Sequence, residues 1–85
     1  MAEEKEIGKI THYFGKISVG IIELAGTLKV GDKIHIKGNA TDFEQDVNSV
    51  QIEHEDVPEA KAGDSIGIKV NEQVREGDLV YLVTE

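Results

Sequence analysis

Residues 30–36 read Val-Gly-Asp-Lys-Ile-His-Ile, a phrase that returns as Ala-Gly-Asp-Ser-Ile-Gly-Ile at 62–68 and as Glu-Gly-Asp-Leu-Val-Tyr-Leu at 76–82. Each copy contains a glycine, an aspartate and then apolar residues at alternate positions. Glycine adopts positive φ at no steric cost, and an aspartate side chain accepts hydrogen bonds from nearby backbone N–H groups. Alternating apolar residues are typical of a strand with one buried face. Each copy therefore predicts a turn that leads into a strand.

The rest of the chain predicts further short strands and no helix. Alternating patterns cover residues 6–14, 17–24, 32–37, 41–54, 65–70 and 78–84. The longest of these changes its inward phase between Val47 and Val50, as a β-bulge would cause. The pattern predicts an all-β domain, a single closed six-stranded antiparallel barrel of Greek-key type, because closure removes exposed strand edges. We expect residues 1–5 to form a disordered N-terminal tail and residues 6–85 to form the one domain.

Two of the repeated phrases resemble a known family once their flanking residues are included. Residues 26–36 read Gly-Thr-Leu-Lys-Val-Gly-Asp-Lys-Ile-His-Ile, and residues 59–68 read Glu-Ala-Lys-Ala-Gly-Asp-Ser-Ile-Gly-Ile. In this order and spacing they resemble the second domain of translational GTPases such as elongation factor Tu, over about residues 7–83. The resemblance implies a six-stranded barrel, which in those factors meets ribosomal RNA and the aminoacyl end of transfer RNA. Similar barrels also occur as the C-terminal appendage of a collagenase-like peptidase family.

Composition narrows the possible functions. The 85 residues carry a formal net charge of −8 and include no cysteine, so disulfide and thiolate chemistry are excluded. No apolar run approaches the roughly 18–20 residues of a membrane helix, and the acidic start lacks the apolar core of a signal peptide. We therefore expect a cytoplasmic protein without a membrane partner. The chain has no Gly-x-x-x-x-Gly-Lys-Ser/Thr phosphate loop, so we expect no GTP binding by this chain alone.

The sequence contains no recognisable catalytic or metal-binding motif. Its serines have no base at a recognisable spacing, and alternate acids such as Glu44 and Asp46 more often share a solvated strand face than perform acid–base chemistry. The histidines His12, His35 and His54 lack the two-ligand spacing of helical or hairpin metal sites. We therefore expect no enzyme activity, no cofactor and no metal ion.

A set of cations and aromatic side chains is the first candidate for a binding surface. The set consists of Lys9, His12, Tyr13, Lys16, Lys33, His35 and Lys37. Cations beside aromatic rings on a β surface hold RNA through phosphate contacts and base stacking, which would make this chain a non-catalytic module that contacts transfer RNA, ribosomal RNA or a translation factor. The opposing interpretation is a solvated face whose lysines discourage edge pairing. The net charge of −8 favours that interpretation, because RNA affinity comes largely from neutralised phosphates.

An acidic stretch is the second candidate. Residues 42–59 hold seven acidic residues and no lysine or arginine. Such a stretch could dock a basic surface of a partner enzyme, for example a peptidase, through Glu53, Glu55 and Asp56, because complementary charge speeds association. The opposing interpretation is a solvated, repulsive surface that keeps a small domain soluble. The sequence leaves the RNA-binding function and the adaptor function open.

Overall fold

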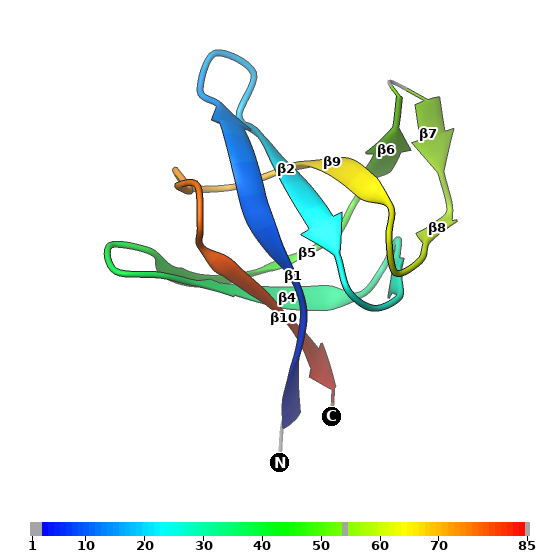
Figure 1. The fold of residues 1–85 in the computed structure, drawn as a ribbon, viewed down its shortest axis with the longest axis horizontal. Coiled ribbons are helices and arrows are strands. Elements are labelled where there is room, and N and C mark those ends of the chain that lie inside the picture. The colour runs from blue at the N-terminus through cyan, green and yellow to red at the C-terminus, as the bar shows by residue number, and fades with distance from the viewer. Residues whose placement is uncertain (1–2, 54, 85) are drawn as a thin grey trace.

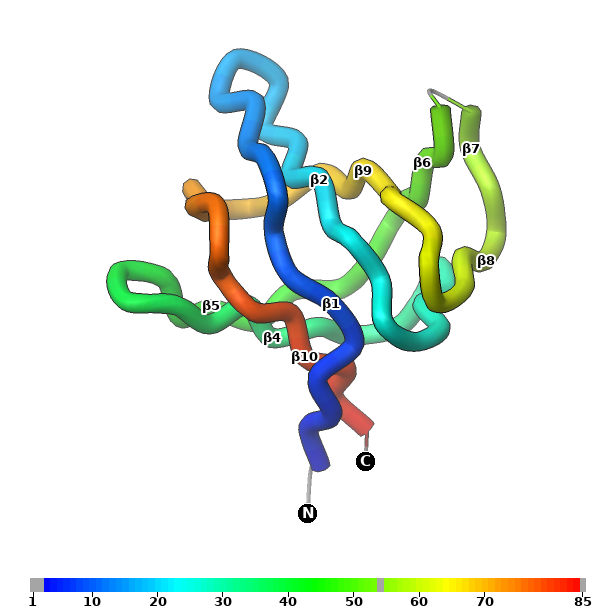
Figure 2. The backbone as a smooth tube through the Cα atoms, viewed as in Figure 1, coloured from blue at the N-terminus to red at the C-terminus, as the bar shows by residue number. Residues whose placement is uncertain are grey.

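The computed structural model describes residues 3–53 and 55–84, and all the regular structure in them is β-strand. The strands are β1 (Glu3–Phe14), β2 (Val19–Leu24), β3 (Leu28–Lys29), β4 (Lys33–Lys37), β5 (Asp42–Asp46), β6 (Val50–Ile52), β7 (Glu55–Val57), β8 (Glu59–Ala60), β9 (Ser65–Lys69) and β10 (Leu79–Thr84). Eight of them form one sheet in the order β5-β4-β10-β1-β2-β9-β6-β7, which curls around a core, and β3 pairs with β8 (Figures 1 and 2). The all-β prediction is confirmed. None of the described segments is a helix with the length and hydropathy needed to cross a membrane.

The three Gly-Asp phrases form one turn three times. Gly31, Gly63 and Gly77 have φ of 97°, 94° and 92°. In each turn the aspartate N–H donates to the carbonyl oxygen three residues earlier, at 3.0–3.1 Å. The aspartate Oδ2 in turn accepts the N–H of that same earlier residue, at 2.9 Å. This is the hydrogen bonding of a type II turn, reinforced by a side chain, and each turn leads into a strand as predicted.

The core is aliphatic and lies inside the curled sheet. Alternation predicts the inward residues of β4 correctly, because Ile34 and Ile36 are fully buried while Lys33 and Lys37 are exposed. The buried cluster contains Ile7, Ile10, Ile22, Leu24, Leu28, Ile34, Ile36, Val47, Val50, Ala60, Ile66, Ile68, Val70, Val74 and Val80. Removal of this apolar surface from water is the main contribution to the stability of so small a domain.

The predicted closed, six-stranded barrel is wrong in two respects. The sheet has eight strands, and its end strands β5 and β7 do not pair with each other, so it remains open. The expected single strand over 41–54 is interrupted after β5. There the Val47 N–H donates to the Asp32 carbonyl and the Val47 carbonyl accepts the Gly31 N–H, both at 2.8 Å. The chain at Val47 is therefore bound to the first Gly-Asp turn, and residues 47–49 belong to no strand before β6 begins at Val50.

The first strand is longer and more irregular than its pattern indicates. β1 begins at Glu3, which pairs with Thr84, so residues 3–5 of the expected tail belong to the sheet, and residues 1 and 2 lie outside the described residues. Register shifts place Ile7 and Thr11 as extra residues in β1, opposite β10 and β2 respectively. A bulge reverses which residues point inward. These shifts decide which side chains of β1 reach the outer surface.

Candidate functional site

The outer face of β4 carries the best-defined charged cluster. Paired residues of antiparallel strands share a face, and the cations of β4 lie opposite acids of β5: Lys33 opposite Asp46, His35 opposite Glu44 and Lys37 opposite Asp42. Lys9 belongs to the same face, because Lys9 and Lys37 both pair with Leu79. The Lys33 Nζ lies 3.3 Å from Glu44 Oε1. The predicted lysine surface is therefore interleaved with carboxylates.

His35 lies at the centre of this cluster. Its Nδ1 is 2.8 Å from Glu4 Oε2, and its Nε2 contacts Asp42 Oδ1, although 31 residues separate His35 from Glu4. The hydrogen bond to Asp42, and next the one to Glu4, raises the pKa of His35 above its ordinary value, while partial burial opposes the shift. The same contact with His35 lowers the pKa of Asp42. The imidazole ring of His35 thus contacts two carboxylates, one from β1 and one from β5.

The other three predicted RNA-binding residues lie at the end of β1 and in the turn that follows it. His12 is exposed beyond the Thr11 bulge, with Nδ1 3.3 Å from Glu76 Oε1. Tyr13 packs against the core, and Lys16 is exposed in the turn between β1 and β2. The strand pairing therefore places Lys9, Lys33, His35 and Lys37 on one face, whereas Tyr13 packs against the core and Lys16 lies in the turn after β1.

The acidic stretch 42–59 divides into two parts at opposite ends of the sheet. Asp42 to Asp46 form β5, whereas Glu55 and Asp56 belong to β7 in the hairpin with β6 (Figure 1). Glu53 follows β6 with φ of 51°, and Asp56 accepts a hydrogen bond from Gln51 Nε2 at 3.1 Å. His54, the third histidine, lies outside the described residues. The three predicted docking residues are therefore exposed on one hairpin.

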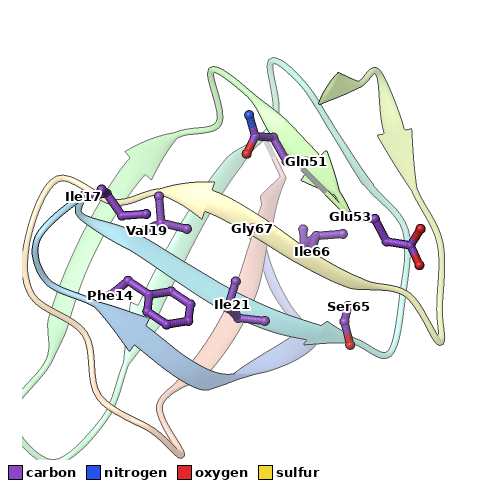
Figure 3. Close-up of a pocket in the computed structure, with 9 residues that line it drawn as sticks. All are labelled: Phe14, Ile17, Val19, Ile21, Gln51, Glu53, Ser65, Ile66 and Gly67. Atoms are coloured by element: carbon purple, nitrogen blue, oxygen red, sulfur yellow. The ribbon is translucent and has the colours of Figure 1, made fainter. Parts of the chain in front are cut away.

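An apolar groove lies next to this hairpin, and the sequence pattern alone does not predict it. Gly20, Ile22 and Leu24 are the buried residues of β2, so Val19 and Ile21 face outward. They line the groove with Phe14 and Ile17, whose exposed fractions are 50% and 61%. Across β9, the groove is lined by Gln51 and Glu53, as Figure 3 shows.

The absence of a side chain at Gly67 shapes the floor of the groove. Gly67 of β9 pairs with Ile21 of β2 and with Gln51 of β6. A Cβ at this position would lie 3.4 Å from Val19 Cγ1 and 3.5 Å from Ile21 Cδ1, so even a small side chain would fill the space. Alternation in residues 17–24 places Ile17, Val19 and Ile21 on one face, and only the burial of Gly20, Ile22 and Leu24 in the structure identifies that face as the outer one.

Comparisons with known proteins identify related chains of two kinds. A family model described as elongation factor Tu domain 2 matches residues 15–81. An uncharacterized protease of Methanocaldococcus jannaschii is 49% identical over 81 residues, which cover 94% of this chain and 20% of that protein. A collagenase of Porphyromonas gingivalis is 36% identical over 77 residues, which cover 88% of this chain and 21% of that protein. The chain thus spans about a fifth of the length of these curated relatives.

Solved structures of known proteins also have this fold. The crystal structure of the C-terminal domain of a Geobacillus thermoleovorans protein assigned to the U32 peptidases superposes with a TM-score of 0.87. The match covers 92% of this chain and 91% of that domain at 14% sequence identity. At this identity the likeness concerns the fold alone.

Proposed function

For this chain, which belongs to the elongation factor Tu domain 2 family, we propose a non-catalytic docking function in which the outer groove binds a partner enzyme of the peptidase class. The observation that carries this proposal is the exposure of Phe14 and Ile17 beside the acidic β6–β7 hairpin. Exposed apolar side chains gathered within a polar rim are typical of protein–protein contact sites. The curated relatives support the class of partner, since a segment like this chain makes up about a fifth of a protease and of a collagenase.

The charge of the groove rim indicates the chemistry of the partner surface. Glu53 lines the groove, and Glu55 and Asp56 are exposed on the adjoining hairpin. A complementary surface presents an aliphatic or aromatic side chain to the groove and lysine or arginine to the hairpin. Such a surface, in the same polypeptide or in another, would cover Ile17 and neutralise part of the net charge of −8.

Isothermal titration against the part of the Methanocaldococcus jannaschii protease outside the matched region tests this function. We expect saturable binding that Ile17→Asp weakens about tenfold or more, because it places a charge in the apolar contact. Reversal of Glu53, Glu55 and Asp56 to lysine should weaken binding as well. The control is Lys33→Glu with Lys37→Glu on β4, outside the groove, which should leave binding unchanged. Equal effects of the groove and control variants would refute the docking function.

RNA contact through the lysine-bearing face is the second candidate function. The match to elongation factor Tu domain 2 favours it, whereas the acids opposite Lys33, His35 and Lys37 oppose it, since phosphate would have to displace them. An amide NMR titration with bulk transfer RNA at low and then physiological salt distinguishes the two functions. RNA binding predicts shifts on residues 33–37 that persist at physiological salt and disappear in the Lys33→Glu, Lys37→Glu variant. Docking alone predicts no shifts there.

A further inference from the structure

Three strands bring metal-ligand atoms to one point on the outer face of the sheet. Glu4 of β1, His35 of β4 and Glu44 of β5 each offer one such atom, and these atoms all lie within 4.8 Å of one another. One imidazole nitrogen and two carboxylate oxygens form a donor set that suits Zn²⁺ and neighbouring divalent transition metals. We propose that Glu4, His35 and Glu44 form a binding site for a divalent transition-metal ion of the zinc type.

The positions of the ligands in the sheet favour this site. In the strand order β5-β4-β10-β1, Glu44 approaches His35 from one side and Glu4 reaches it across β10 from the other. Ligands of a tetrahedral zinc ion stand about 3.4 Å apart when each lies about 2.1 Å from the metal. Both glutamates are exposed, so small side-chain rotations bring them to that separation. Solvent is available to supply the fourth ligand.

The orientation of the His35 ring is a second observation that points to a ligand. A metal-binding histidine usually makes a hydrogen bond to a carboxylate with its other ring nitrogen, which sets the ring and its tautomer. Asp42 contacts Nε2 in this way and leaves Nδ1 turned toward Glu4. Asp42 is therefore a positioning residue, and the metal would replace the proton on Nδ1.

The neighbouring lysines should weaken metal binding at this site. Lys33 Nζ lies 3.3 Å from Glu44 Oε1, where it competes for the carboxylate and repels a second cation. Lys37 lies opposite Asp42 in the β4–β5 pair, and its positive charge makes a minor contribution to stabilising the Asp42 carboxylate. Replacement of Lys33 by glutamine frees Glu44 and should strengthen metal binding, a gain that a purely structural role for Glu44 does not predict.

Titration of the full chain with Zn²⁺ by calorimetry, and with Co²⁺ by visible absorption, tests the site. We expect one ion per chain with a dissociation constant below about 100 μM. Glu4→Gln and His35→Gln should weaken binding about tenfold or more, Asp42→Asn by about 10–100-fold, and Lys33→Gln should tighten it. The control is His12→Gln, which removes the exposed histidine beside Glu76 and should leave binding unchanged.

Three results would overturn the site. They are a dissociation constant above about 1 mM for the unaltered chain, full binding by both Glu4→Gln and His35→Gln, or an equal loss in the His12→Gln control. Because Glu4 is exposed, the Glu4→Gln variant keeps the test informative even if His35→Gln loosens the sheet. The groove shares only Phe14, at the opposite end of β1 from Glu4, with the strands of the metal site, so failure of the metal site leaves the docking function untouched, and the reverse also holds.

Discussion

Gln45 and Lys69 lie on strands that do not pair, yet the Gln45 Nε2 group donates a hydrogen bond to the Lys69 carbonyl oxygen at 2.8 Å. The Gln45 Oε1 accepts the Asn71 N–H, also at 2.8 Å. One amide side chain, only 6% exposed, thus joins β5 to the end of β9 without a backbone ladder between the two strands. Without the Gln45 side chain, the Lys69 carbonyl and the Asn71 N–H would lose these hydrogen bonds in a part-buried region.

Replacement of this amide by an apolar side chain of similar size should destabilise the fold. We expect Gln45→Leu to lower the free energy of unfolding by about 1–3 kcal/mol, because it leaves a donor and an acceptor unpaired. Urea denaturation measures the change. Gln73→Leu, at an exposed position, is the control and should be near neutral. A loss of stability no larger than that of the control would mean that water satisfies the Lys69 carbonyl and the Asn71 N–H as well as the amide does.

The positive φ of Gly31 predicts a cost that comes from the backbone alone. A Cβ at Gly31 would meet no atom within 4 Å, so Gly31→Ala should destabilise by about 1–2 kcal/mol through conformation only. Asparagine tolerates this region of φ and ψ better, and Gly31→Asn should therefore cost less. Thermal unfolding of the two variants gives the comparison. The explanation fails if asparagine and alanine have the same effect.

Gly38 predicts a steric cost instead. A Cβ at Gly38 would overlap the Asp78 side chain, which is 5% exposed and accepts the Arg75 N–H. Gly38→Ala must displace this buried carboxylate and should lower the free energy of unfolding by about 1–3 kcal/mol. In Gly15→Ala the new Cβ would meet only Tyr13 Cε2, at 3.5 Å, so this matched variant should be tolerated. Urea unfolding of both variants distinguishes the steric overlap at Gly38 from a general effect of replacing glycine by alanine.

The contact between His35 and Asp42 predicts a maximum of stability at acidic pH. The pKa of His35 is raised above 6.5, so its contribution is complete below pH 6.5 and is lost as the pH rises through the folded-state value. The pKa of Asp42 is lowered from 3.8, so its contribution is complete above that pH and is lost as the pH falls through the folded-state value.

The measurement for this prediction is unfolding free energy against pH for the native chain and for His35→Gln, with a metal chelator present. The difference in stability between the two should be largest between about pH 4 and pH 6.5 and should shrink above the folded-state pKa of His35. His12→Gln is the matched control, since His12 is exposed and faces one carboxylate only. A difference that does not change with pH would show that His35 acts through packing rather than charge.

Local sequence determines the turns and the alternation within the regular strands. Each turn needs only a glycine that adopts positive φ and the aspartate that follows it. The turns at Gly31, Gly63 and Gly77 can therefore be predicted from a few consecutive residues of the sequence. The burial of Ile34 and Ile36, with cations on the opposite face, follows from a period of two. The order of the phrases also predicts the family.

Only the tertiary structure decides which of these local pieces meet. The end strands β5 and β7 do not pair, so the sheet stays open, and the bulges at Ile7 and Thr11 determine which residues of β1 point outward. Glu4 contacts His35 from 31 residues away, and the separate pairing of β2 with β9 places Val19 and Ile21 in the outer groove. A period-two pattern shows that a strand has two different faces, but it does not show which face points inward or how the strand is aligned with its neighbours. Contacts between distant strands decide both.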